Sequence, residues 1–167
     1  MSNARKIIEK LELQAHPEGG YFKEIYRSGE VIQDAYLPER YKGNRSFSTS
    51  IYFLLDQEDK SHFHRILSDE IWHFYSGSPI LIHCIDNDGQ YRIYRLGNNL
   101  EKEEQPQIII SRSTWFAAEV EDKNDYALIG CTVSPGFEFV DFELGSEKNL
   151  IELFPQHADL IKKFTRS

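Results

Sequence analysis

The sequence predicts a mostly β protein, a barrel or jelly roll with a short helix at each end. Two observations predict this class. Between about residues 45 and 145, short runs rich in β-branched and aromatic residues recur roughly every 8 to 12 residues, with turn signals between them. Apolar residues at helical spacing occur only near the two ends of the chain, which excludes a parallel sheet with crossover helices.

The composition indicates the number of domains and excludes several classes of protein. The chain has 167 residues, 40% of them hydrophobic, with 11 Phe, 9 Tyr and 2 Trp, which predicts one domain over 1–167 and excludes a disordered chain. No apolar run approaches the roughly 20 residues of a membrane span, and no signal peptide is evident, so we expect a cytoplasmic protein without a membrane partner. The net charge is −8 and basic residues alternate with acids, which excludes nucleic acid as a partner.

The N-terminal elements are predicted in order. A helix is expected over residues 4–12, with Ser2 or Asn3 as a candidate N-cap. Alternating residues over 21–28 predict a strand. Residues 29–44 are polar, with Pro and Gly, and predict a loop long enough to act as a lid or as an arm that binds a partner.

The barrel strands and the last helix follow. The strands are predicted at 46–55, 61–66, 70–75, 79–85, 90–96, 107–111, 114–120, 126–133 and 137–144. Beyond them, Pro155 is placed to begin a helix over about 155–165, with Leu160, Ile161 and Phe164 on one face.

The densest group of chemically active residues is the segment SHFHRILSDEIWH, residues 61–73. Residues two apart on a strand share a face, so His62 and His64 are expected to point the same way. With Glu70 beside them on the next strand, two imidazoles and a carboxylate suit either a divalent metal or proton transfer. The alternative is that the histidines lie on an exposed or interface face and that Glu70 is a turn acid.

This segment resembles the first motif of the cupins, which are small double-stranded β-helix barrels. The HxH pair and the six residues between Glu70 and Gly77 match that motif, whereas the usual distance from the second histidine would select Asp69, and Asp56 replaces a usual glycine. Nearly the whole chain is similar to one cupin family described as a domain of unknown function. The similar segments are 16–28, 48–55, 61–79 and 130–144.

The resemblance implies a candidate metal site made of His62, His64 and Glu70. The second cupin motif would supply a fourth ligand, a histidine, but Phe116 stands in that position. Two histidines and one carboxylate can still hold a catalytic metal with open positions. The cofactor therefore stays unknown, with a divalent metal as one alternative.

Without metal, the resemblance to cupins that epimerise deoxysugar nucleotides implies His62 as the catalytic base. Asp141 is a candidate for the acid that orients this base, and Tyr52 or Tyr75 for the proton donor. Each has an ordinary alternative, because a strand aspartate is commonly solvated and strand tyrosines commonly pack with a satisfied hydroxyl.

Further residues are candidates for ligand binding. Arg27, Arg45 and Lys23 could meet a phosphate, or could instead pair with surface acids. Large aromatic side chains could stack on a base or a sugar ring, or simply fill the core. The complete set of candidate ligand-binding residues is Tyr21, Phe22, Arg27, Arg45, Trp72, Trp115 and Glu138.

The favoured hypothesis is a cupin barrel that binds a small polar ligand, such as a nucleotide or a nucleotide sugar, with acid–base isomerase or epimerase activity. A metal-dependent cupin enzyme and a non-enzymatic binding or storage-type cupin are the alternatives. Cupins commonly pair edge strands, so the resemblance also implies a homodimer, with the strand at 21–28 as the candidate interface.

Overall fold

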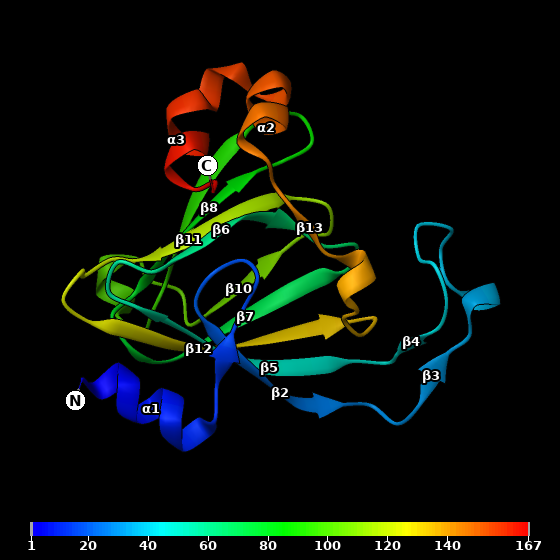
Figure 1. Ribbon diagram of the computed structural model, residues 1–167, viewed down its shortest axis with the longest axis horizontal. Helices are drawn as coiled ribbons and strands as arrows, with labels where there is room; N and C mark the ends of the chain where they lie inside the picture. Colours follow the sequence, from blue (N-terminus) through cyan, green and yellow to red (C-terminus); the bar gives the residue numbers. More distant parts are fainter. Residues whose placement is uncertain (1, 167) are drawn as a thin grey trace.

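A computed structural model describes residues 2–166. The chain forms two facing antiparallel sheets, with one helix near the N-terminus and further helices near the C-terminus (Figure 1). The protein is mostly β, with 42% strand and 21% helix, and its sheets form the jelly roll that the sequence predicts.

The first sheet has six strands in the order β1-β2-β5-β12-β7-β10, all antiparallel. Their bounds are Gln14–Ala15, Tyr21–Arg27, Thr49–Asp56, Tyr126–Ser134, Asp69–Gly77 and Gln107–Ile110. The second sheet has five strands in the order β13-β6-β11-β8-β9. Their bounds are Glu143–Leu144, Lys60–Arg65, Trp115–Val120, Ile80–Ile85 and Tyr91–Leu96.

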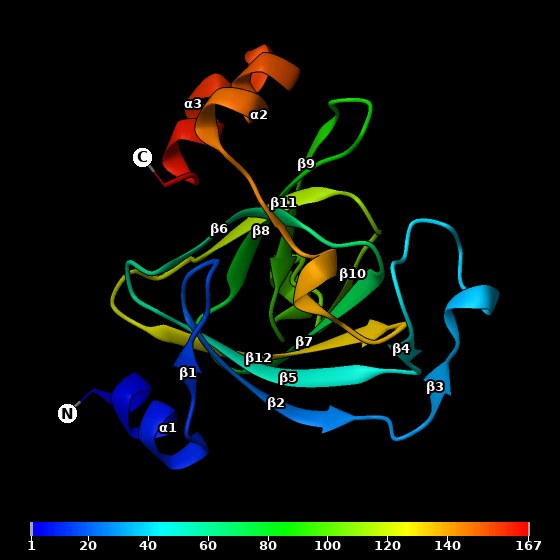
Figure 2. The same ribbon diagram turned by 45° about the vertical axis from the view of Figure 1, so that its right-hand side comes forward.

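A two-stranded ribbon projects from the sheets (right in Figures 1 and 2). Its first strand lies within the loop predicted at 29–44, and its second strand follows directly after that loop. It consists of β3 (Val31–Ile32) and β4 (Arg45–Ser46), with the 3₁₀ turn η1 (Asp34–Tyr36) at its end.

The prediction that two copies of the chain pair through residues 21–28 stays a prediction.

The core lies between the two sheets. Because successive side chains of a strand point to opposite faces, alternate residues of each strand enter it. Phe53, Trp72, Ile82, Phe116 and Ile129 all belong to this core and are at most 1% exposed. The eight strands predicted between residues 46 and 133 all coincide with observed strands.

The predicted strand at 137–144 is wrong. Residues Phe139–Asp141 form the 3₁₀ turn η3, closed by hydrogen bonds from Asp141 N–H to Glu138 O and from Phe142 N–H to Phe139 O, and only β13 follows. The turn forms because the carboxylate of Asp141 is drawn inward to Arg45, with Nε–Oδ2 and Nη2–Oδ1 distances of 2.7 and 2.6 Å.

The two ends of the chain cover the outer faces of the sheets. Helix α1 (Asn3–Leu11) is capped by the Ser2 hydroxyl, as predicted, and packs on the first sheet around Leu54. The C-terminal part covers the second sheet (Figure 2) and begins earlier than predicted. It comprises α2 (Glu147–Leu153), η4 (Pro155–His157) and α3 (Ala158–Lys163); a further 3₁₀ turn, η2, spans Leu100–Lys102.

Within residues 2–166, no helix combines the length and the apolar character that crossing a membrane requires.

Candidate active site

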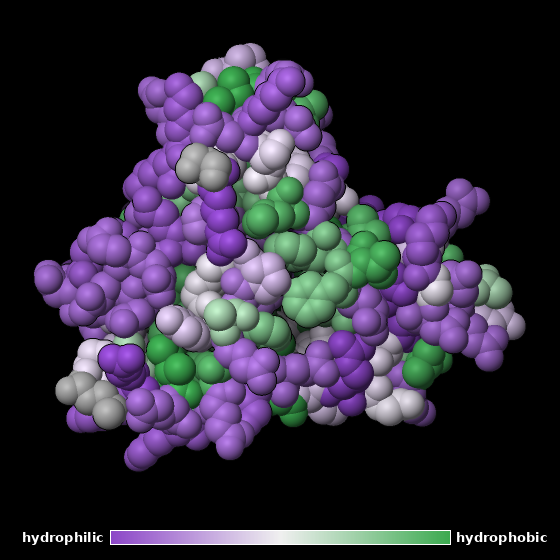
Figure 3. All heavy atoms as spheres, viewed as in Figure 1, coloured by the Kyte–Doolittle hydropathy of each residue, from purple (hydrophilic) through white to green (hydrophobic). Residues whose placement is uncertain are grey.

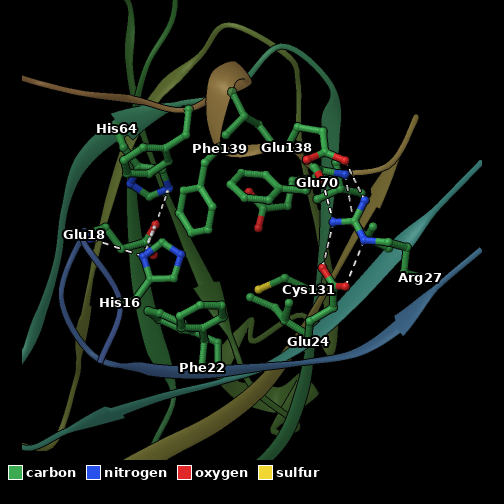
Figure 4. Close-up of a pocket in the computed structure, with 17 residues that line it drawn as sticks. His16, Glu18, Phe22, Glu24, Arg27, His64, Glu70, Cys131, Glu138 and Phe139 are labelled. Carbon is green, nitrogen blue, oxygen red and sulfur yellow. Dashed lines mark hydrogen bonds and ion pairs between the residues drawn. The ribbon is translucent and has the colours of Figure 1, made fainter. Parts of the chain in front are cut away.

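A pocket opens between the two sheets, beside β2 and η3 (Figure 4). The space between its walls, together with the solvent-filled opening, measures about 660 Å³. Its walls are mostly apolar, with Phe22, Phe53 and Phe142 among them, and hydrophobic atoms gather on this face between the β1–β2 turn and η3 (Figure 3). Two groups of polar side chains interrupt the walls, one buried deep in the pocket and one at the mouth.

The β1–β2 turn, sequence HPEGG, places Glu18 at the deep end. Gly19 and Gly20 have φ values of 110° and 71°, and a Cβ on Gly19 would overlap the carbonyl oxygen of Lys60. Only glycine allows this approach at that backbone conformation. The turn therefore presses against β6, and the Glu18 side chain reaches Ser61 and His64, which lie on that strand.

Strand β6 contains a β-bulge at the predicted HxH pair. His64 lies opposite Phe116 and Ser61 opposite Ala118, so β6 has one extra residue between these two positions. His64 lines the pocket, whereas His62 lies beside the β1–β2 turn with Nδ1 at 2.6 Å from the carbonyl oxygen of Glu18. The prediction that His62 and His64 share a face is wrong, because the bulge breaks the alternation between them.

Glu18 and His64 form a buried pair. The Ser61 hydroxyl donates to Glu18 Oε1 at 2.8 Å, and His64 Nε2 lies 3.0 Å from Glu18 Oε2. His64 Nδ1 lies 2.8 Å from the carbonyl oxygen of His62, which can only accept, so Nδ1 carries a proton and one further proton is shared between Nε2 and Oε2.

The shared proton lies on the carboxyl. Burial lowers the pKa of His64 to about 3. Burial also raises the pKa of Glu18 well above its ordinary value, and the nearby Glu70 carboxyl adds to this rise. Glu18 is therefore protonated and donates to a neutral His64.

His16 lies beside this pair and faces the cavity. Its Nδ1 accepts a hydrogen bond from the Glu18 backbone N–H at 3.2 Å, so the neutral ring carries its proton on Nε2. Burial lowers the pKa of His16 to about 4, which keeps the ring neutral. Figure 4 shows the other ring nitrogen directed into the cavity, and no group among residues 2–166 hydrogen-bonds to it.

Glu70 supplies a second buried carboxyl from the start of β7. It is 8% exposed, lines the same pocket and has no lysine or arginine partner within residues 2–166. Burial raises the pKa of Glu70 to about 7, although the Trp72 indole and the Cys131 thiol nearby oppose the rise. The indole Nε1 of Trp72 is itself buried without a hydrogen-bond partner in the described chain.

Arg27 lies at the mouth of the pocket and joins several groups there by hydrogen bonds. Its guanidinium forms two hydrogen bonds of 2.9 Å with Glu24, one of 2.8 Å with Glu138 and one of 2.9 Å with the carbonyl oxygen of Phe137. These side chains are between 35% and 44% exposed, so they form a rim. Arg27 thereby links β2 to the segment around η3.

The predicted metal ligands do not fit a metal centre. Only His64 and Glu70 of the three line the pocket, and the Phe116 ring packs on His64 with centroids 4.1 Å apart. Across residues 2–166, no three His, Cys, Asp or Glu side chains are grouped as metal ligands would be. Phe116 thus occupies space beside the imidazole where a further ligand would stand.

The other predicted catalytic residues lie outside this pocket. Asp141 and Arg45 form a buried ion pair that holds η3. Tyr52 and Tyr75 lie on the outer face of the first sheet, in edge-to-face contact at 6.1 Å, and Tyr75 is 47% exposed. The structure does not bring these side chains together with His64 or Glu70.

The predicted ligand-binding residues divide in the same way. Phe22, Arg27 and Glu138 line the pocket. Tyr21 packs beneath α1, Trp72 lies in the core between the sheets, and Trp115 lies beneath the C-terminal helices.

His16 and Glu18 are pocket residues that the sequence patterns missed. Both belong to the HPEGG turn, whose proline and glycines indicate a break between a helix and a strand and no functional role. The two successive glycines were the available signal, because they permit a close backbone approach. Nothing local in the sequence indicates that the approach is to β6.

Two facing antiparallel sheets with a pocket between them form the jelly roll that is typical of cupins. Residues 5–145 match the family described as Cupin superfamily (DUF985), and the chain belongs to this family. It is also similar to the uncharacterized protein YML079W of Saccharomyces cerevisiae, with 29% identity over 149 residues that cover 84% of this chain and 74% of the yeast protein.

Solved structures agree with this assignment. The protein SO0799 from Shewanella oneidensis is 38% identical, with a TM-score of 0.88 over 99% of both chains. A hypothetical protein from Leishmania major is 33% identical, with a TM-score of 0.90 over 99% of this chain and 100% of that one. Oxalate decarboxylase from Bacillus subtilis has 12% identity and a TM-score of 0.55 over 90% of this chain and 36% of its own, a likeness that shows the fold alone.

Proposed function

We propose that this cupin binds a small organic ligand in the pocket and catalyses an isomerisation by proton transfer beside a carbonyl group. One observation carries the proposal. The buried side chains of His16, Glu18 and Glu70 face or border one cavity, and no lysine or arginine within residues 2–166 holds the two buried acids ionised. Such uncompensated buried acids are characteristic of functional sites.

Glu70 is the group suited to moving the proton. A carboxyl with a pKa of about 7 exists in both forms near neutral pH, so it can remove a proton and return it. In the proposed reaction the carboxylate takes a proton from the carbon next to the carbonyl, and the electron pair moves to the carbonyl oxygen. The Glu70 acid then returns the proton on the same face, either to the original carbon or, in a hydroxyketone, to the former carbonyl carbon, while the hydroxyl proton moves to the former carbonyl oxygen.

His16 is the group suited to stabilising the oxygen. Its Nε2 carries the ring proton because Nδ1 accepts from the Glu18 backbone, and it is directed into the cavity. A fixed N–H donor in a buried site stabilises a developing oxyanion. Glu18 and His64 act as positioning residues, because their shared proton and the Ser61 hydroxyl hold the β1–β2 turn against β6.

The lining favours a ligand without phosphate over the nucleotide or nucleotide sugar that the resemblance implies. Among described residues, Arg27 is the only lysine or arginine that lines the pocket, and Glu24 and Glu138 already bind it. Phosphate recognition usually draws on free Arg or Lys donors.

The test is enzyme-dependent deuterium incorporation. A set of small ketones, hydroxyketones and lactones is incubated with the protein in D₂O, and exchange beside the carbonyl is followed by NMR. We expect exchange in at least one compound, and E70Q should slow it by at least about 100-fold, the contribution of a general base.

H62N is the matched control, because His62 lies on the same strand as His64 but outside the pocket lining, and the asparagine amide can still donate to the carbonyl oxygen of Glu18 as the His62 ring does. We expect H62N to exchange at the wild-type rate. Loss of exchange in H62N with normal exchange in E70Q would contradict the proposal and favour His62 as the base. Saturable binding without exchange in any compound would favour a non-enzymatic binding cupin.

A further inference from the structure

The charged side chains around the pocket are unbalanced. Four of the lining residues are glutamates, namely Glu18, Glu24, Glu70 and Glu138, against the single Arg27. Arg27 can offset only one carboxylate at the mouth, where its guanidinium binds both Glu24 and Glu138. The rim therefore carries excess negative charge, and the deep end adds a buried carboxyl, Glu70, that no cation within residues 2–166 neutralises.

Aromatic rings surround the same mouth. Phe137 and Phe139 lie 5.0 Å apart at 81°, Phe139 and Phe142 lie 6.2 Å apart at 74°, and Phe22 and Phe139 lie 6.5 Å apart at 76°. Rings in near-perpendicular pairs present faces in several directions. The face of an aromatic ring carries partial negative charge and attracts cations.

Two deeper groups are aimed into the cavity: the Glu70 carboxyl, which has no lysine or arginine partner within residues 2–166, and the Nε2 atom of His16. Glu70 is 8% exposed and His16 is 9% exposed, and Figure 4 shows both side chains extending into the pocket. The His16 Nε2 hydrogen is a donor without an acceptor within residues 2–166. A ligand of this pocket therefore gains by bringing an oxygen acceptor to His16 and positive charge toward the glutamates.

We infer that the ligand is a small organic cation, with an ammonium group held between the phenylalanine rings and the carboxylates of Glu24 and Glu138, and with an oxygen acceptor directed at His16. The inference rests on the proposed function, whose substrate class it names. An anion would meet the carboxylates of Glu24 and Glu138 at the mouth and Glu70 deeper in the pocket, with Arg27 as the single basic residue of the lining, and a neutral ligand would leave the excess charge of the rim uncompensated.

The experiment compares three probes of nearly the same shape. Choline, 3,3-dimethyl-1-butanol and 3,3-dimethylbutanoate have a bulky head on a two-carbon chain and differ chiefly in charge. Their affinities are measured by titration calorimetry or NMR shifts at pH 7. We expect choline to bind about tenfold more tightly than the butanol, within the range of a desolvated cation–π contact, and the butanoate to bind most weakly. Equal affinity of choline and the butanol, or preference for the butanoate, would overturn the inference.

Three variants locate the effect. F139L keeps an apolar side chain but removes the aromatic face, and E138Q removes one rim charge; each should weaken choline binding by about three- to tenfold. Phe139 is 51% exposed, so its replacement leaves the core intact. The control is Y36L, since Tyr36 is 80% exposed on the projecting ribbon, and it should bind choline as the wild type does. Unchanged affinity in both F139L and E138Q would place the cation elsewhere and contradict the inference.

The two proposals fail separately. Choline has no carbonyl, so its binding reports the charge preference alone, whereas deuterium incorporation reports proton transfer. Choline preference without exchange in any compound would retain the ligand class and contradict the chemistry. Exchange in neutral ketones without choline preference would retain the chemistry and contradict the ligand class.

Discussion

Two buried histidine–glutamate pairs lie on opposite faces of the second sheet. On the inner face, His64 Nε2 is 3.0 Å from Glu18 Oε2; on the outer face, His83 Nε2 is 3.3 Å from Glu119 Oε1. All four side chains are less than one-tenth exposed. The residue types and the degree of burial match, yet the two carboxyl groups have opposite protonation states.

The difference is the presence of lysine. Burial by itself would raise the pKa of Glu119, but Lys163 at 2.7 Å and Lys123 at 3.0 Å lower it to about 2. Glu18 has no such partner within residues 2–166, and burial together with Glu70 raises its pKa. In this chain a buried carboxylate that holds structure together is matched by cations, whereas the buried acids of the pocket are left without them.

The outer pair, His83 and Glu119, holds the C-terminal segment against the second sheet. Lys163 belongs to α3, and the ring of the adjacent Phe164 packs on His83 with centroids 4.7 Å apart. The carbonyl oxygen of Phe164 also accepts a 2.8 Å hydrogen bond from the Phe63 N–H of β6. Glu119 therefore helps to fasten α3 to the sheet, while Glu18 borders a cavity.

The largest effect expected from this comparison is a pH-dependent loss of stability that Glu70 causes. Its pKa rises from 4.5 to about 7 on folding, so the folded state holds this proton more tightly than the unfolded chain. The stabilising contribution is complete below pH 4.5 and is lost as the pH rises through 7. Between pH 5 and pH 8, the free energy of unfolding of the wild type should fall relative to E70Q by about 2.5 kcal/mol.

Urea unfolding of both proteins at pH 5, 6, 7 and 8 measures this difference. Because the Glu70 carboxyl also raises the pKa of Glu18, the same comparison is made between E18Q and E18Q/E70Q, in which Glu70 is the only one of the two acids that differs. Parallel stability profiles of the wild type and E70Q would show that Glu70 ionises normally. The buried acids on the inner and outer faces of the second sheet would then not differ in protonation.

A smaller effect on the free energy of unfolding is expected when the glutamate of each histidine–glutamate pair is replaced by glutamine. E119Q removes the charge that pairs with Lys163 and Lys123, and should lower the free energy of unfolding by about 2 kcal/mol, less than for a fully buried pair because both lysines are partly exposed. E18Q should change it by less than about 1 kcal/mol, because the glutamine oxygen still accepts from Ser61 and its amide still donates to His64.

Chemical denaturation at pH 7 provides both values. Equal destabilisation by E18Q and E119Q would mean that Glu18 is ionised in the folded protein and that the two faces do not differ in protonation.

The fold was predictable from sequence to a large extent because short runs rich in β-branched and aromatic residues alternate with turn signals. This signal also holds for strands that are covered on both faces, such as β11, which is buried along its whole length. The exception is 137–144, which has the composition and the alternating phenylalanines of a strand. Here Phe137, Phe139 and Phe142 line a pocket, and Asp141 turns the backbone toward Arg45. The alternating phenylalanines belong here to the wall and mouth of a pocket and not to a strand.

The site was predictable only in part. His64, Glu70, Phe22, Arg27 and Glu138 were identified and line the pocket. The role of His62 depended on strict alternation, which the bulge in β6 breaks, and a bulge is defined by the partner strand. Glu18 lies 43 residues before Ser61, so no local pattern connects them.

The central claim is that Glu18 is protonated on the inner face while Glu119 is ionised on the outer face. Carboxyl ¹³C NMR of glutamate-labelled protein, assigned with E18Q and E119Q, measures both states in one sample. At pH 6 the Glu18 signal should have the shift of a protonated carboxyl and the Glu119 signal that of a carboxylate, because burial without cations raises one pKa and two lysines lower the other to about 2. Two carboxylate shifts at pH 6 would contradict the claim.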